Sequence, residues 1–157
     1  MQNTVTAQPG KYAGTKKSLI GKVYTDIRTV SFLPGWTFKQ GDVINAVGDP
    51  EIITADVYQK ETTYLVLFSI NDDTATNQFI ITDVLEVKAV IKGWTVKTSF
   101  CRQQQIDNSW IVALAKETPT EYLAIIKKAW RFNPDKRRIE LISTKGIDCL
   151  NQEFDID

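Results

Sequence analysis

The chain has 157 residues, of which 43% are hydrophobic and 24% are charged, so it can bury a core without metal or disulfide staples and is not disordered by composition. Lysine plus arginine and aspartate plus glutamate number 19 each, which removes any long-range attraction toward nucleic acids or anionic membranes. The sequence contains no histidine, which excludes serine–histidine and cysteine–histidine nucleophile pairs and the usual zinc ligand. We therefore expect no metal site, no cofactor and no nucleic-acid partner.

The first part of the chain predicts a polar segment followed by a short helix. Residues 1–11 are polar and contain the Pro9-Gly10 pair, so we expect them to be disordered, with residues 12–157 forming a single domain. From Thr15 onward, apolar residues recur at a spacing of three to four positions as far as Tyr24. This spacing is typical of an amphipathic helix, which Thr15 can cap.

The middle of the chain predicts antiparallel β-strands. Residues 30–33 and 36–38 flank the Pro34-Gly35 pair and indicate two short strands joined by a tight turn. Residues 64–70 are largely apolar on both faces of an alternating pattern, as in a strand at the centre of a sheet. Further strands are expected at residues 79–90, 94–100, 110–115 and 138–143.

A second helix is predicted from Pro119 to about Lys128. Thr118 and Glu121 stand at the positions of a capping box, with proline at the first helical position. On a helix, the apolar residues of this segment share one side and the charged residues share the other. The segment from Trp130 to Phe132 has two interpretations, the last turn of this helix or the first strand of a hairpin, because Asn133-Pro134-Asp135 predicts a turn.

Together these elements predict an α+β fold, in which one antiparallel, meander-like β-sheet carries one or two packed helices within a single domain. The sequence has no run of about 18 apolar residues, so we expect no transmembrane segment.

The two cysteines, Cys101 and Cys149, lie in segments with predicted β-structure. In an oxidising compartment they would form one disulfide, and in a reducing cytosol they would be two buried thiols. The polar residues after Met1 resemble the start of a mature secreted protein from which a leader has been removed. On that interpretation the location is periplasmic or secreted; otherwise it is cytoplasmic.

Two groups of residues are candidates for binding a partner. Six basic residues crowd one stretch and could attract an anionic or acidic protein partner: Lys127, Lys128, Arg131, Lys136, Arg137 and Arg138. Trp36, beside the Pro34-Gly35 turn, is the tryptophan expected to be partly exposed, whereas Trp94, Trp110 and Trp130 are expected in the core. The alternative for the basic stretch is an ordinary solvated face with no binding role.

These observations support two functional hypotheses of different classes. The first is a non-catalytic protein-binding domain of the cell envelope or secreted space, which acts as an inhibitor or immunity-type partner of another protein. A partner surface needs no sequence motif, and the chain contains none that indicates catalysis. The second is a small carboxylate-based enzyme or ligand-binding domain, whose pocket would be lined by tryptophan and hold two convergent carboxylates.

Overall fold

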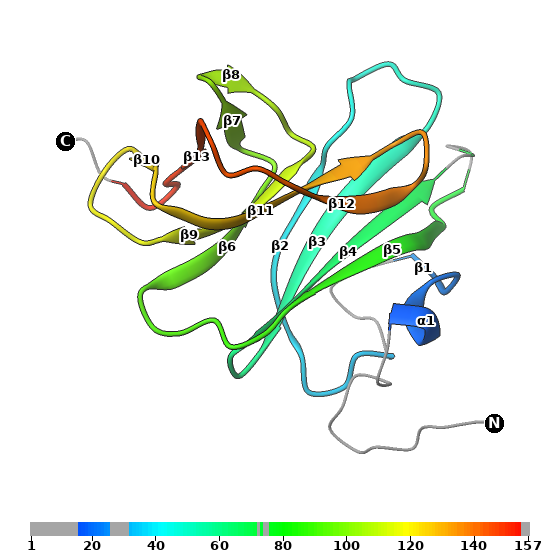
Figure 1. Cartoon of the computed structure of the whole chain (residues 1–157). Coiled ribbons are helices and arrows are strands. Elements are labelled where there is room, and N and C mark those ends of the chain that lie inside the picture. Colours follow the sequence, from blue (N-terminus) through cyan, green and yellow to red (C-terminus); the bar gives the residue numbers. More distant parts are fainter. Residues whose placement is uncertain (1–15, 26–31, 72, 74–75, 155–157) are drawn as a thin grey trace. The chain divides into compact units, whose positions relative to one another are not determined.

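The computed structural model describes residues 16–25, 32–71, 73 and 76–154, and β-strands dominate this part of the chain (Figure 1). The chain divides into two compact units, residues 1–89 and 90–157. The prediction of an α+β fold is wrong, because the described residues contain a single helix of four residues and are otherwise organised as antiparallel sheets. The predicted disorder of residues 1–11 lies outside the described residues, and a single domain for residues 12–157 stays a prediction.

The first unit is one five-stranded antiparallel sheet in the order β1-β5-β4-β3-β2. Four consecutive strands form a meander, and the short β1 joins its β5 edge. The elements are α1 (Lys16–Leu19), β1 (Val23–Tyr24), β2 (Thr37–Val43), β3 (Ile52–Lys60), β4 (Thr63–Asn71) and β5 (Phe79–Val87). The predicted central strand is confirmed, because β4 lies between β3 and β5 and is buried from Leu65 to Asn71.

The core of the first unit lies against one face of this sheet. Helix α1 contributes Leu19, and the loop before β2 contributes Leu33. The buried cluster comprises Leu19, Tyr24, Leu33, Tyr58, Leu65, Leu67, Ile81 and Val84. The predicted Pro34-Gly35 turn is confirmed, since the Trp36 N–H donates to the Leu33 carbonyl across 3.3 Å and Gly35 has a φ of 85°.

The first predicted helix is shorter than the apolar period suggested. Helix α1 ends at Leu19, and Gly21 takes a φ of 93°, a conformation that glycine adopts at no steric cost. The chain then enters β1, where Tyr24 pairs with Phe79 of β5. The last apolar residues of the predicted helix, Val23 and Tyr24, therefore pair with strand β5 at the edge of the meander instead of continuing the helix.

The second unit contains two four-stranded antiparallel sheets, in the orders β12-β11-β9-β6 and β10-β13-β7-β8. Its strands are β6 (Trp94–Thr98), β7 (Cys101–Gln103), β8 (Ile106–Asp107), β9 (Ile111–Lys116), β10 (Tyr122–Leu123), β11 (Ile126–Asn133), β12 (Arg138–Ile142) and β13 (Ile147–Leu150). A buried cluster joins the two sheets through Cys101, Ile111, Ala113, Ala129, Ile147 and Cys149. The unit is thus a small β-sandwich with the two cysteines in its core.

The helix predicted from Pro119 to Lys128 is wrong, and so is the helical interpretation of Trp130 to Phe132. Within this stretch Tyr122–Leu123 forms β10 and Ile126–Asn133 forms β11, and β11 pairs with both β9 and β12. A β-bulge leaves Lys127 without a partner on β9, so Ile126 and Ala129 point to the same face although they are three residues apart. With Phe132 buried on the opposite face, the protected positions recur every third residue and imitate a helical period.

The predicted capping box has a different role in the structure. The Asn151 side chain donates to the carbonyl oxygens of Thr118 and Thr120 across 3.1 and 3.0 Å. The Asn151 N–H donates to the Glu121 carbonyl across 2.8 Å. Because these bonds satisfy the backbone of the segment from outside, it runs as a loop into β10. None of the helices in the described part of the chain is long and apolar enough to cross a membrane.

A candidate binding surface beside the disulfide

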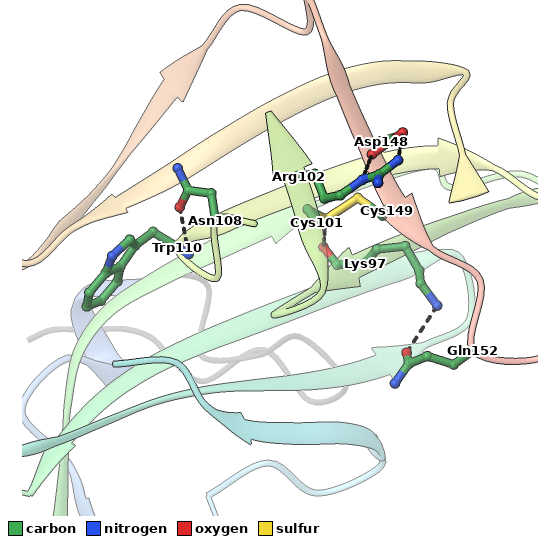
Figure 2. Close-up of a disulfide and its surroundings, with 8 residues drawn as sticks. All are labelled: Lys97, Cys101, Arg102, Asn108, Trp110, Asp148, Cys149 and Gln152. Carbon is green, nitrogen blue, oxygen red and sulfur yellow. Dashed lines mark hydrogen bonds and ion pairs between the residues drawn. A yellow bond between two sulfur atoms is a disulfide. The ribbon is translucent and has the colours of Figure 1, made fainter. Parts of the chain in front are cut away.

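Cys101 and Cys149 form a disulfide, as the sequence predicted for an oxidising compartment (Figure 2). The two residues are direct partners on the neighbouring strands β7 and β13, and both are almost completely buried. The Leu150 N–H donates to the Phe100 carbonyl across 2.9 Å, so Phe100 and Leu150 form a hydrogen-bonded pair of the ladder. Cys101 and Cys149, one position along, form a non-hydrogen-bonded pair. The bond therefore cross-links two adjacent strands of one sheet.

The residues on either side of the cysteines point away from the core. Side chains alternate along a strand, so when Cys101 and Cys149 face inward their neighbours face outward together. The register places Tyr122, Leu150 and Phe100 in one row, and Asp148, Arg102 and Asp107 in the next. We call this surface the Arg102 face; it consists of Phe100, Arg102, Asp107, Tyr122, Asp148 and Leu150.

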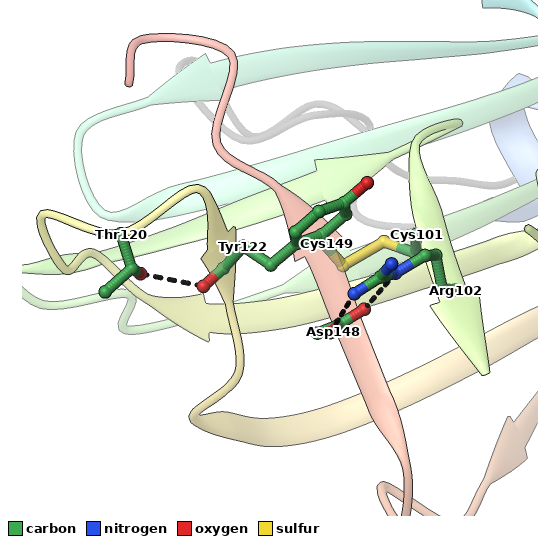
Figure 3. A network of polar contacts seen from close by, with 6 residues as sticks. All are labelled: Cys101, Arg102, Thr120, Tyr122, Asp148 and Cys149. Carbon is green, nitrogen blue, oxygen red and sulfur yellow. Dashed lines mark hydrogen bonds and ion pairs between the residues drawn. A yellow bond between two sulfur atoms is a disulfide. The ribbon is translucent and has the colours of Figure 1, made fainter. Parts of the chain in front are cut away.

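Arg102 organises the centre of this face (Figure 3). Its Nε and Nη2 atoms donate to the two carboxylate oxygens of Asp148 across 2.9 and 2.7 Å. Its guanidinium carbon lies 3.5 Å from the centroid of the Tyr122 ring. The hydrogen bonds to Asp148 raise the pKa of Arg102, so the guanidinium stays charged. The two hydrogen bonds to Asp148 and the stacked Tyr122 ring together hold the Arg102 side chain in one orientation.

A cavity of about 440 Å³ opens on the same face. It is lined by Ser99, Phe100, Cys101, Asp107, Ser109, Tyr122 and Leu150, all from the second unit. Phe100 is 42% exposed and is one of several large hydrophobic residues at the surface of the described chain. The cavity thus combines the aromatic rings of Phe100 and Tyr122 with one carboxylate and two serine residues.

Residues other than glycine have positive φ values on both sides of β7, and one of them, Ser99, lines the cavity. Ser99 has a φ of 74°, and the Phe100 N–H donates to the Thr98 carbonyl across 2.8 Å, which defines a γ-turn of the rare type. Gln104 and Gln105 have φ values of 52° and 67° in the two-residue loop between β7 and β8. Such positions cost on the order of 1–3 kcal/mol each and cluster at functional sites.

The six basic residues predicted to bind a partner do not form one surface. Lys128 points to the opposite face of β11 from Arg131, and Lys127 occupies the bulge. Lys127 lies over the Trp94 ring at 5.8 Å, and Arg131 pairs with Glu140 at 3.6 Å. The charges of Lys127 and Arg131 are therefore partly engaged by neighbours in their own sheet.

The rest of the basic group lies at the β11–β12 turn. The Asn133 side-chain oxygen accepts the N–H groups of Asp135 and Lys136 across 3.0 and 3.1 Å and closes the turn. Arg137 occupies the left-handed region with a φ of 57°, and Arg138 begins β12 opposite Asn133. A partner-binding role for the basic group stays a prediction.

The four tryptophans are half-buried rather than core residues. Trp36 packs at the edge of the core cluster of the first unit, and Trp110 stacks on Phe132 with ring centroids 6.2 Å apart. None of the four lines the cavity beside the disulfide. Trp94, Trp110 and Trp130 were expected in the core, and each is half-buried in the structure.

Asp56 of β3 is a buried carboxyl group that sequence reasoning missed. It is 4% exposed, and its Oδ2 atom accepts the Tyr24 hydroxyl at 3.3 Å and the Thr54 hydroxyl at 3.2 Å. It packs against Gly41 so closely that a Cβ there would collide with Asp56 Oδ1. Burial raises the pKa of Asp56 to about 7, and burial with the neighbouring Asp56 charge also raises the pKa of Tyr24. The first unit therefore holds a carboxyl that titrates near neutral pH.

Comparison of the chain with family models, curated proteins and solved structures found no match. Within the described residues, no cluster of three or more aspartate, glutamate or cysteine side chains is arranged to hold a metal ion. Arg102, Tyr122 and Asp148 were not singled out from the sequence. A signal for two of them exists, because a bridge between neighbouring strands predicts that the residues next to Cys101 and Cys149 share the outer face.

Proposed function

We propose that this protein is a non-catalytic binding partner of another protein in the cell envelope or secreted space, of the inhibitor or immunity type, and that it binds through the Arg102 face. The observation that carries the proposal is the make-up of this face, where Phe100 and Tyr122 line a cavity and Arg102 stacks on the Tyr122 ring. Arginine and aromatic residues are the types that dominate the binding free energy of protein interfaces.

The rigidity of this face also supports binding. The disulfide lies directly beneath it, and the Asp148 carboxylate and Tyr122 ring hold Arg102 in place. A surface that is already ordered loses less conformational entropy on association. An intramolecular disulfide is compatible with an oxidising compartment outside the cytoplasm, which supports the proposed location.

The alternative, a carboxylate-based enzyme with a tryptophan-lined pocket, has less support in this geometry. The cavity is lined by one carboxylate, Asp107, and by no tryptophan. The buried Asp56 belongs to the other unit and is enclosed by the Tyr24 and Thr54 hydroxyls and by Gly41. The binding hypothesis therefore explains the exposed aromatic residue and the cavity more simply.

A capture experiment tests the proposal. The immobilised protein is incubated with the envelope and secreted fractions of its native source, in parallel with Phe100→Asp and with Leu141→Asp as the matched control. Leu141 is 70% exposed on β12 of the other sheet in the same unit, so it reports on general loss of apolar surface. We expect one protein to be retained by wild type and control, and its retention to fall at least roughly tenfold with Phe100→Asp.

The retained protein then decides the type of partner. An inhibitor or immunity role requires that the activity of the retained protein falls when the complex forms and recovers with Phe100→Asp. Equal retention by all three forms, or no retention by wild type, would overturn the proposed function.

A further inference from the structure

The charges on the Arg102 face do not balance. Arg102 is the basic residue of the face, and both of its bonded nitrogens are directed at Asp148. Asp107 is exposed at the edge strand β8, and within the part of the chain that the structure describes it belongs to no ion pair. Asp107 is the register partner of Arg102 and its charge acts on that guanidinium, but the face holds two carboxylates and one guanidinium. The face therefore carries a net charge of one negative unit, and Asp107 lines the cavity.

The cavity offers more than charge to a cation. Phe100, which is 42% exposed, lines the same cavity, and so do the hydroxyl-bearing residues Ser99 and Ser109. A carboxylate beside an aromatic face binds cations through Coulomb attraction and the ring quadrupole acting together. Tyr122 already stacks on the Arg102 guanidinium at 3.5 Å, which shows how an aromatic ring of this face accommodates a planar cation.

We propose that this cavity binds a cationic side chain, lysine or arginine, of the partner protein. The Asp107 carboxylate pairs with the positive charge of that side chain, and the Phe100 ring packs against its aliphatic part. This inference rests on the proposed function, because it identifies the chemistry of the partner residue that enters the cavity. It also places the partner contact apart from the basic residues of β11 and β12, and it assigns the partner a basic rather than an acidic contact at this point. A volume of about 440 Å³ accommodates one long side chain.

The test uses small probes and therefore needs no knowledge of the partner. The full chain is titrated with N-acetyl-lysine methylamide and N-acetyl-arginine methylamide while the amide resonances of the cavity residues are followed by NMR. N-acetyl-norleucine methylamide matches the lysine stem without its charge and serves as the control probe. We expect saturable shifts at Ser99, Phe100, Asp107 and Ser109 with a Kd on the order of 1–10 mM for the cations, and at least roughly tenfold weaker binding of norleucine.

Two variants and one matched control locate the binding to named residues. Asp107→Asn removes the charge and retains the shape, and Phe100→Leu retains an apolar side chain without the ring. Each variant is expected to bind the cationic probes with roughly five- to tenfold lower affinity than wild type. Asp135→Asn, an exposed aspartate in the β11–β12 turn, is expected to leave binding unchanged. Three results would each overturn the inference. The norleucine probe could bind with the same affinity as the lysine probe, wild type and Asp107→Asn could bind the cationic probes equally, or no saturable shift could be seen at the cavity.

The two proposals fail in different ways. If the capture experiment retains a protein in a Phe100-dependent manner but the cationic probes do not bind, the cation site is wrong and the binding function stands. If the probes bind through Asp107 and no protein is retained, the cavity is a cation site and the proposed function is wrong.

Discussion

The Arg102 guanidinium is held between the Tyr122 ring, whose centroid lies 3.5 Å from the guanidinium carbon, and the Asp148 carboxylate, which accepts bonds of 2.9 and 2.7 Å. These contacts join β7 to β10 and β13 across the outer face of one sheet. Replacing Arg102 by lysine retains the charge but loses the paired hydrogen bonds of the planar guanidinium to Asp148 and its stacking on the Tyr122 ring. We therefore expect the thermal unfolding midpoint to fall with Arg102→Lys and to fall further with Arg102→Ala.

Calorimetry of the three proteins checks this order. An exposed cation in the same unit, Lys145→Ala, serves as the control and should leave the midpoint unchanged. If Arg102→Lys unfolds at the wild-type midpoint, the paired hydrogen bonds and the stacking of Arg102 contribute nothing to thermal stability beyond the charge.

The disulfide is expected to stabilise the second unit substantially. It closes a loop with a sequence separation of 48 residues, for which the chain-entropy model predicts about 4 kcal/mol of stabilisation, an upper range for a native bridge. Urea unfolding with and without a phosphine reductant measures the effect. The double variant Cys101→Ala/Cys149→Ala should be less stable than the oxidised wild type and insensitive to the reductant. An unchanged unfolding midpoint after complete reduction would contradict this role.

Asp56 makes the stability of the first unit depend on pH. Its folded-state pKa is raised from 3.8 to about 7, so between these values the folded state binds more protons than the unfolded state. Stability is therefore highest below about pH 4 with respect to this group and is lost as the pH rises toward about 7, by on the order of 2–4 kcal/mol in total.

Hydrogen exchange of the β3 and β4 amides between pH 4 and 8 measures this loss. Asp56→Asn retains an oxygen that accepts the Tyr24 and Thr54 hydroxyls and carries no charge. The variant should be more stable than wild type at pH 8 and should flatten the pH dependence. Equal stability of wild type and variant at pH 8 would show that the carboxylate is not penalised by burial.

The loop between β7 and β8 contains conformational strain that a glycine would relieve. Gln104 and Gln105 both have positive φ values, which a type I′ turn requires, and the second position of such turns favours glycine. Gln105→Gly is expected to stabilise the protein by about 0.5–1 kcal/mol, measured by urea unfolding. Gln103→Gly, one strand position earlier in β7, is the matched control and should destabilise it by about 0.5–1 kcal/mol. A loss of stability in both variants would show that the turn is not strained.

Much of the β-structure was predictable because alternation of side chains is a local property. The segments at residues 64–70, 94–100, 110–115 and 138–143 carried it, residues 79–90 were also expected as a strand, and strands occupy most of each. The β11 strand was missed for an equally physical reason. The bulge at Lys127 shifts the alternation by one residue, so Ile126 and Ala129 share a face and the local pattern becomes one of period three.

The candidate site shows the same division between local pattern and tertiary pairing. The sequence by itself determined that the chain has two cysteines, that no histidine is available for catalysis and that the charges balance overall. Only the tertiary structure decided that Cys101 and Cys149 are direct partners on adjacent strands, and this pairing brings Arg102 to Asp148 over 46 positions of the chain. Strand register depends on contacts between segments far apart in the chain, and no local pattern of residues contains that information.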